Sequence, residues 1–244
     1  ETVLNRNFFQ NSKINFFSNG IISSINNQTK QINNYLNLKF ENANLKRENL
    51  DLKIKLNSIF KDSSINYYKG EYKIKIADIV SNSIKYSKNF LIINKGYNDS
   101  VKLDDGLITN EGIVGIINQV SPKYSTAISI LNSDLKINAK IKRTNHFGSL
   151  QWKGKNHKIM TLYDIPKSAN IKINDSVVSG GMSFIFQENI PIGKIKNINL
   201  KENSNYFIID VELFEDFSSL RSVYIISNSN KSELDNLNVN NEIY

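Results

Sequence analysis

The residue types that most often carry catalysis are sparse in this sequence. It holds two histidines and no cysteine, which excludes a thiolate nucleophile, a thiolate metal site and a disulfide. His146 and His157 each lie in a polar, lysine-flanked stretch. Neither has a partner at the spacing of an H-x-x-x-H or H-x-E motif. We therefore interpret both as surface histidines, and we expect no metal ion and no cofactor.

One short segment has the composition of a protease motif. Ser179-Gly180-Gly181 is similar to the sequence around the nucleophile of chymotrypsin-like proteases, which are double β-barrels. Histidines and aspartates precede Ser179 in the order that the catalytic triad requires, but at spacings too short to join residues from two barrels. Val177 and Val178 also interrupt the Asp-Ser-Gly-Gly form. A glycine turn that closes a strand is the favoured interpretation, and we predict no enzyme.

The net charge of +8 raises the question of nucleic acid or an anionic surface as a ligand, because clustered Lys and Arg neutralise phosphates. The lysines are instead scattered among asparagines and isoleucines along the whole chain. Without a clustered basic face, we expect no nucleic-acid binding.

An N-terminal helix is predicted over residues 13–61, which contain no proline and only one glycine, Gly20. Apolar residues follow a helical period, with leucines seven residues apart in the second half. A narrow seam flanked by Lys, Glu and Arg is typical of a coiled coil. The predicted dimerisation residues are Ile25, Ile32, Leu38, Asn42, Leu45, Asn49, Leu52, Leu56 and Ile59.

Asn42 and Asn49 occupy seam positions of this predicted coil. A buried asparagine lowers stability but needs a partner across the interface, so it fixes register and oligomeric state. We therefore interpret the two residues as determinants of a parallel dimer. The alternative is a single amphipathic helix that folds onto its own globular domain.

The composition changes near Asp62, where β-branched residues begin to alternate with polar ones. Short runs separated by Gly, Asn, Asp and Ser predict a sandwich or barrels. The predicted strands are 73–80, 90–94, 112–120, 126–131, 136–141, 158–163, 176–179, 192–198, 207–213 and 222–226.

Glycines and a few aromatic residues punctuate this β region. The glycines lie in no nucleotide-binding motif, and we assign six of them to structural turns or bulges: Gly96, Gly112, Gly115, Gly180, Gly181 and Gly193. Trp152 is either core or interface, with core favoured. Phe184, Ile185 and Phe186 lie near turns and are either core or an exposed anchor for a partner.

Four motifs in a fixed order resemble the bacterial rod-shape-determining protein family MreC, especially its Bacteroidetes versions. They are "NNYLNLKFENANLKRENLDLK" in the helix, "NKG" at residues 94–96 with the following "DGLITNEGIVGIINQV", "NDSVVSGG" and "FQENIPIGKI". Asn174 and Asn189 stand where relatives usually carry Gly, and Gln187 where they carry Pro. Because Asn tolerates positive φ, we expect the first two changes to preserve their turns.

The resemblance implies a mainly β fold in which a long N-terminal α-helix, forming a coiled coil, precedes two small antiparallel β-barrels. The expected organisation is a juxtamembrane segment (1–12), a coiled coil (13–61), a first barrel (62–141) with or without the last strand, a second barrel (142–228) and a flexible tail (229–244).

The resemblance also implies a non-enzymatic scaffold that maintains cell shape. It would be a homodimer, able to form a higher assembly, that binds the penicillin-binding transpeptidase of elongation, MreD and MreB. Such proteins are single-pass inner-membrane proteins with this region in the periplasm, and the expected anchor lies upstream of Glu1. Two alternatives remain: a periplasmic module that binds wall polymer directly, and the serine protease considered above.

Overall fold

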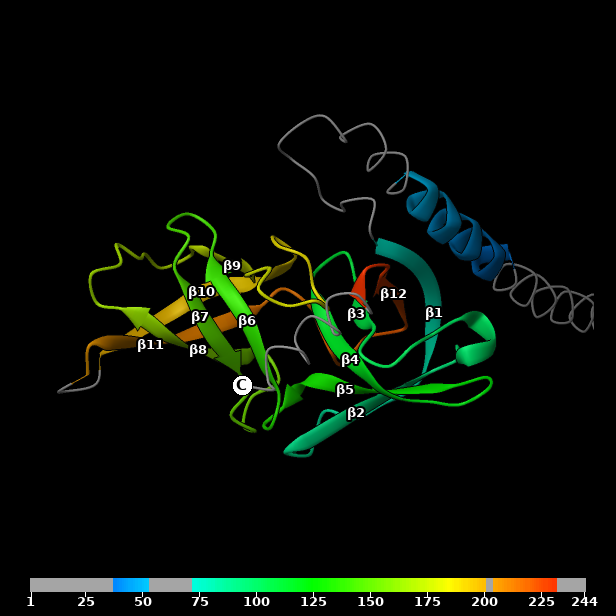
Figure 1. Cartoon of the computed structure of the whole chain (residues 1–244), viewed down its shortest axis with the longest axis horizontal. Coiled ribbons are helices and arrows are strands. Elements are labelled where there is room, and N and C mark those ends of the chain that lie inside the picture. Colours follow the sequence, from blue (N-terminus) through cyan, green and yellow to red (C-terminus); the bar gives the residue numbers. More distant parts are fainter. Residues whose placement is uncertain (1–36, 53–71, 201–203, 232–244) are drawn as a thin grey trace, which may run out of the picture. The chain divides into compact units, whose positions relative to one another are not determined.

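A computed structural model describes residues 37–52, 72–200 and 204–231. Within these ranges the chain forms an α-helix over residues 37–52, a short 3₁₀ helix and the strands β1 to β12, and the strands close into two antiparallel barrels (Figure 1). The predicted fold class is thereby confirmed. The helix and the barrels belong to different compact units, so each is described by itself.

The described part of the helix covers residues 37–52, a stretch without Gly or Pro that combines the helix formers Leu, Lys and Glu with four asparagines. Its leucines at seven-residue spacing are largely exposed: Leu38 by 57%, Leu45 by 54% and Leu52 by 50%. Asn42 donates its side-chain N–H to the carbonyl of Leu38 at 3.0 Å. No helix in the described ranges combines the length and the hydropathy of a membrane span. The predicted seam residues Ile25, Ile32, Leu56 and Ile59, and the segment 1–12, lie outside the described residues.

The first barrel has six strands in the order β1, β12, β3, β4, β5 and β2. Alternation of apolar and polar residues directs one face of each strand inward. In β2, for example, Asn89, Leu91 and Ile93 are buried while the residues between them are exposed. The bounds are β1 Tyr72–Asn82, β2 Lys88–Ile93, β3 Gly106–Ile108, β4 Ile113–Val120, β5 Ser125–Asn132 and β12 Ser222–Asn228.

The second barrel has six strands in the order β10, β11, β8, β7, β6 and β9. Trp152 directly follows β7, is 3% exposed, and donates its indole N–H to the carbonyl of Asn156 at 2.8 Å. The tryptophan is therefore a core residue. The bounds are β6 Lys136–Ile141, β7 Phe147–Gln151, β8 Ile159–Pro166, β9 Ser176–Ser179, β10 Pro191–Leu200 and β11 Tyr206–Leu213.

The division between the barrels differs from the expected boundary at residue 141. β6 pairs with β7 and β9 and so belongs to the second barrel. Only the short link 133–135 separates β5 from β6, so the sequence there looks like a hairpin although the chain crosses between barrels. β12 pairs with β1 and β3 in the first barrel. The sequence pattern also missed β3 and β7, which span only three and five residues.

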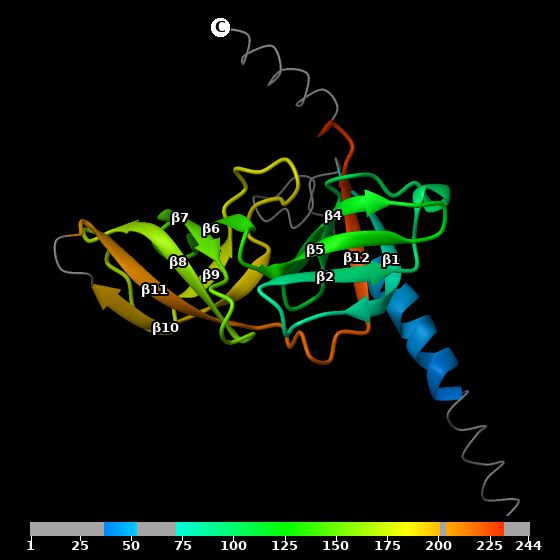
Figure 2. The same cartoon turned by 90° about the horizontal axis from the view of Figure 1, so that it is seen from below.

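The chain crosses back to the first barrel through residues 214–221, between β11 and β12 (Figure 2). Phe217 in this crossing is fully buried, and its carbonyl accepts a 2.7 Å hydrogen bond from the Asn82 side chain of β1. The nearby Glu215 carboxylate is hydrogen-bonded to the Thr109 hydroxyl of the β3–β4 hairpin. The crossing segment thus contacts the first barrel before it becomes the last strand of that barrel.

Candidate partner-binding surface

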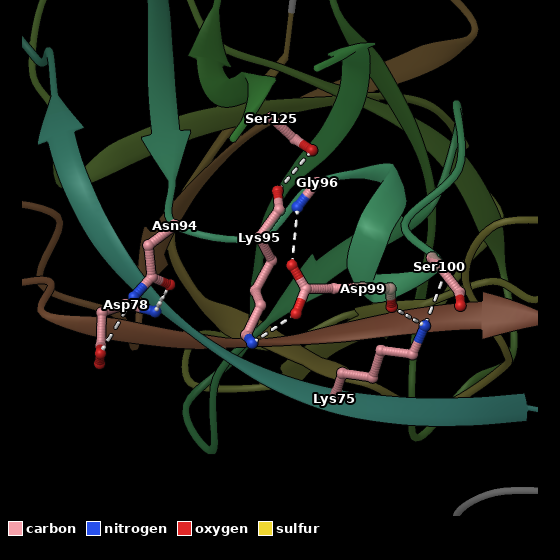
Figure 3. A network of polar contacts seen from close by, with 8 residues as sticks. All are labelled: Lys75, Asp78, Asn94, Lys95, Gly96, Asp99, Ser100 and Ser125. Atoms are coloured by element: carbon pink, nitrogen blue, oxygen red, sulfur yellow. Dashed lines mark hydrogen bonds and ion pairs between the residues drawn. The ribbon is translucent and has the colours of Figure 1, made fainter. Parts of the chain in front are cut away.

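The NKG motif organises one end of the first barrel (Figure 3). Asn94 accepts the backbone N–H of Asp78 from β1 on its side-chain oxygen at 2.8 Å. The Asp99 carboxylate, in the 3₁₀ helix Tyr97–Asp99, accepts the Lys95 ammonium at 2.7 Å and the Gly96 N–H at 3.2 Å. The Lys95 hydrogen bond holds the pKa of Asp99 below its usual value. Gly96 therefore lies in the predicted turn, as the N-cap of this short helix.

Two more hydrogen-bonded side chains fix the same turn. Lys75 of β1 donates to the carbonyls of Asp99 at 2.5 Å and Ser100 at 2.7 Å, and its burial lowers the lysine pKa. The Ser125 hydroxyl donates to the carbonyl of Lys95 at 2.7 Å (Figure 3). Because these polar groups are engaged with one another, the network supports the barrel rather than a reaction.

The other predicted turn glycines of the first barrel and of β10 divide into two groups. Gly112 lies in the hairpin between β3 and β4, where the Thr109 N–H donates to the Gly112 carbonyl at 2.7 Å. Gly115 and Gly193 lie inside β4 and β10, next to register shifts in their ladders. Of the two predicted roles, turn and bulge, these glycines therefore fit the bulge, since both stand beside irregularities of the kind that glycine permits.

Ser179, the serine of the protease-like motif, has a structural role. It is 1% exposed; its hydroxyl donates to the Gln187 carbonyl at 2.5 Å and accepts the Ile190 N–H at 2.8 Å. One side chain thus closes the base of the loop 180–190, which we call the β9–β10 loop. A buried hydroxyl held in two hydrogen bonds is poorly placed to attack a substrate.

The β9–β10 loop takes its shape from residues that tolerate unusual backbone angles. Gly181 has φ of +78° and Asn189 has φ of +69°, so both occupy the left-handed region. Asn174, the other asparagine expected to replace a glycine, also has φ of +69°. Gly180 and Gly181 lie in the predicted turn after β9, and the expectation for both asparagines is confirmed.

Anchors from β6 hold the loop against the second barrel. Asn138 accepts the Gly180 N–H on its backbone carbonyl at 3.0 Å and the Met182 N–H on its side-chain oxygen at 3.3 Å. Lys140, 5% exposed, forms an ion pair with Glu188. A loop tied at both ends can present its central residues in a defined position.

The three central apolar residues of the loop differ in exposure. Phe184 is 37% exposed, Ile185 is partly buried, and Phe186 is only 3% exposed. Met182, which no sequence motif indicated, is 67% exposed. The expectation of an exposed anchor therefore fails for Phe186, which packs into the protein because its ring has an apolar surface to cover on the first barrel.

A groove of about 530 Å³ runs beside these side chains. Its apolar floor includes Ile116 of β4 and Ile137 of β6. On its rim, Lys231 pairs with Asp104 at 2.8 Å, and the exposed Lys136 adds positive charge. The lining residues are Asp104, Ile116, Lys136, Ile137, Asn138, Gly181, Met182, Ser183, Phe184, Ile185, Phe186 and Lys231. The volume of the groove and its largely apolar lining fit the recognition of apolar groups rather than catalysis.

Two carboxyl groups of the barrels are perturbed by burial. Burial raises the pKa of Asp105, which accepts the Lys102 N–H at 2.8 Å, and it also raises the pKa of Glu215. Neither carboxyl belongs to a cluster that could hold a metal ion: no group of three or more potential ligands occurs among the described residues. Burial, and not a metal site, therefore accounts for both raised pKa values.

Comparison with known proteins identifies the family. The model for "Rod shape-determining protein MreC, barrel core" matches residues 79–227, more than half of the chain. The chain belongs to the MreC family. The cell shape-determining protein MreC of Listeria monocytogenes is 29% identical over 164 residues, which cover 66% of this chain and 53% of that protein. The chain spans about half the length of the curated relatives it matches.

Solved MreC structures share the fold. An MreC structure from Listeria monocytogenes matches with a TM-score of 0.62 at 23% identity, over 78% of this chain and 91% of that one. A chain in the complex between Penicillin-Binding Protein (PBP2) and MreC from Helicobacter pylori matches with a TM-score of 0.53 at 17% identity, over 65% of this chain and 99% of that one. At these identities the likeness establishes the two-barrel architecture.

Proposed function

We propose that this chain is a non-enzymatic scaffold of the cell-elongation machinery, which binds a penicillin-binding transpeptidase and positions or activates it. The observation that carries the proposal is the family match over residues 79–227, which spans strands of both barrels. The complex of an MreC with PBP2 in a structural relative supports this class of partner. Activation would require the scaffold to bind the active conformation of the transpeptidase more tightly than the inactive one.

Our proposed contact surface is the groove beside the β9–β10 loop. Met182 and Phe184 are exposed on one wall of the groove, Ile185 is partly exposed there, and Ile116 and Ile137 form the floor. Aromatic and methionine side chains at the edge of an apolar pocket are typical of the residues that dominate binding energy. The loop anchors described above would keep these side chains in place before binding, which reduces the entropy lost on association.

The helix is the proposed dimerisation element. Leu38, Leu45 and Leu52 form a stripe at heptad spacing that is exposed by half or more in the single chain, and a partner helix would bury it. We further propose that the protein is attached to the bacterial inner membrane by a segment upstream of this chain, with this region in the periplasm. MreD and MreB are the proposed partners on the membrane and cytoplasmic sides.

The absence of enzymatic activity is part of the proposal. The buried hydroxyl of Ser179 is used in closing the β9–β10 loop. We therefore expect no labelling of the chain by a serine-directed fluorophosphonate. Labelling that disappears in a Ser179→Ala variant would contradict the scaffold function and favour a hydrolase.

A pull-down from detergent-solubilised membranes of the source bacterium tests the proposal. Residues 1–244 serve as bait, and captured proteins are identified by mass spectrometry. We expect capture of the elongation transpeptidase by the wild type and loss of capture in Phe184→Ala. The matched control is Phe214→Ala, because Phe214 is exposed by 41%, close to the 37% of Phe184, but does not line the groove. Recovery of wall polymer without the transpeptidase would overturn the proposal in favour of direct polymer binding.

A further inference from the structure

The outer face of the first barrel carries an apolar row that crosses its strands. Residues directly opposite one another in adjacent strands share a face of the sheet. Because Leu91 and Ala127 point into the core, their neighbours Phe90 and Ile128 point outward. Following the register from strand to strand, the row runs through Phe90, Ile128, Ile116, Gly106, Ile226 and Ile74.

One part of this outward row is buried. Ile226 is 1% exposed although it faces away from the barrel interior. The cover comes from Phe186 of the β9–β10 loop, which belongs to the second barrel. A Cβ atom placed on Gly106 would lie 2.7 Å from Cε1 of Phe186 and 2.9 Å from Cγ1 of Ile226. The phenylalanine ring thus occupies the space that any side chain at position 106 would need.

A polar contact next to the ring holds the loop in the same position. The side-chain N–H of Asn228, at the end of β12, donates to the carbonyl of Phe184 at 3.2 Å. Phe184 and Phe186 are therefore tied to the first barrel by different interactions, one polar and one apolar. Met182 and Phe184 remain exposed at the groove, within four residues of the buried Phe186.

We propose that Phe186 is the positioning residue of the partner groove: seated over Gly106 and Ile226, it fixes the two barrels against each other and holds Phe184 at the groove wall. The link to partner binding rests on the proposed function, whereas the link between the barrels does not. A groove formed jointly by β4, β6 and the β9–β10 loop keeps its shape only while this contact is intact.

The absence of cysteine permits a direct test with two spin labels. Lys123→Cys and Ser168→Cys place one label on an exposed residue of each barrel. Double electron–electron resonance then measures the distribution of distances between the two labels. Phe186→Ala removes the ring, and Gly106→Val expels it. Phe184→Ala is the control in the same loop. Affinity for the purified elongation transpeptidase is measured in parallel on unlabelled chains carrying the same substitutions.

We expect Phe186→Ala and Gly106→Val each to broaden the distance distribution and to weaken transpeptidase binding about tenfold or more. Gly106→Val should add no further broadening of the distance distribution in the Phe186→Ala background, because the ring it would displace is already gone and its remaining close contact, with Cγ1 of Ile226, lies within the first barrel. Phe184→Ala should weaken binding and leave the distance unchanged.

The wild-type distance distribution in both Phe186→Ala and Gly106→Val, or additive effects in the double variant, would overturn the proposal. If Phe186→Ala does not fold, as judged by circular dichroism, Phe186→Leu is measured in its place with the same criteria. If the wild type does not bind the transpeptidase, the proposed function fails, while the distance measurement still decides whether Phe186 links the barrels.

Discussion

Two apolar stripes in this chain have different fates. On the helix, Leu38, Leu45 and Leu52 remain exposed by half or more. On the outer face of the first barrel, Ile226 is 1% exposed because a loop from the second barrel covers it. The helix stripe repeats every seven residues along the chain. The barrel stripe instead takes one residue from each neighbouring strand and so runs across the sheet.

Apolar spacing alone therefore does not identify what covers a stripe. The barrel stripe is covered by the same chain through Phe186, whereas the proposed cover for the helix stripe is a second copy. Substitutions in the two stripes should therefore affect different measurements: the free energy of unfolding for the barrel and the oligomeric state for the helix.

The largest expected effect comes from truncating the covered stripe. Ile226→Ala should lower the free energy of unfolding of the barrels by about 2–5 kcal/mol, because it leaves a cavity between β12 and the β9–β10 loop. Leu45→Ala should leave this quantity unchanged and weaken the dimer. Urea unfolding followed by circular dichroism measures the first effect, and sedimentation equilibrium measures the second. An equal loss of barrel stability in Leu45→Ala would mean that the helix packs on its own barrels.

A gain of stability is expected from the polar seam positions. Replacing both Asn42 and Asn49 by Leu should stabilise the helical association by about 1–3 kcal/mol, because two polar side chains no longer have to be buried. The same change should mix oligomeric states, because the asparagines no longer select one register. Thermal melting measures the gain in stability, and analytical ultracentrifugation measures the distribution of oligomeric states. A clean dimer of unchanged stability would argue against this role for the asparagines.

A smaller effect is expected at an ion pair of the second barrel. Arg143 donates to both carboxylate oxygens of Asp175, at 2.8 and 2.7 Å, and this holds the pKa of Asp175 below its usual 3.8. Asp175→Asn should reduce the free energy of unfolding at pH 7 by about 1–2 kcal/mol. A depressed carboxyl pKa adds stability above the unfolded-state pKa, and this stability disappears as the pH falls through the folded-state value.

The measurement for this pair is urea unfolding between pH 2 and pH 7. The difference between wild type and Asp175→Asn should shrink below about pH 3.8. A difference that stays constant over the whole range would show that the substitution acts through packing and not through the charge.

The smallest effect is expected at the crossing between the barrels, where a substitution should raise the free energy of unfolding at pH 7 instead of lowering it as Asp175→Asn does. Burial raises the pKa of Glu215 above its usual 4.5, and the neighbouring Glu111 and Asp216 raise it further. The folded state therefore favours the protonated form, so this residue should add stability as the pH falls from 7 through its folded-state pKa. Glu215→Gln keeps an acceptor for Thr109 and should stabilise the protein at pH 7 by about 0.5–1 kcal/mol. Unfolding at pH 7 checks the gain, which should vanish near pH 4.

Much of the fold could be predicted because strand alternation is a local signal. The expected strands 136–141 and 176–179 coincide with β6 and β9, and the others differ from the observed strands mainly at their ends. β3 could not be predicted, since three residues are too few to define a period. The assignment of β6 to the second barrel depends on pairing with β9, a long-range interaction that no local pattern records.

The candidate site was predictable only in outline. Residues 184–186 form an apolar run near a turn, from which a partner surface was predicted, but spacing could not distinguish the buried Phe186 from the exposed Phe184. The distinction depends on Gly106, which lies far away in the sequence and makes room for one ring. The glycine itself was the available signal: it stands between two aspartates and the apolar pair Leu107-Ile108 in the family-like motif "DGLIT".

The pairing of β12 with β1 and β3 also determines the order in which the barrels can be completed during synthesis. All strands of the second barrel, from β6 to β11, leave the ribosome before β12 does. The barrel that begins first is therefore finished last, and until then β1 and β3 are open edges. A chain that stops short of Ser222 would release a closed second barrel attached to an open sheet, a target for proteases and for pairing with other chains.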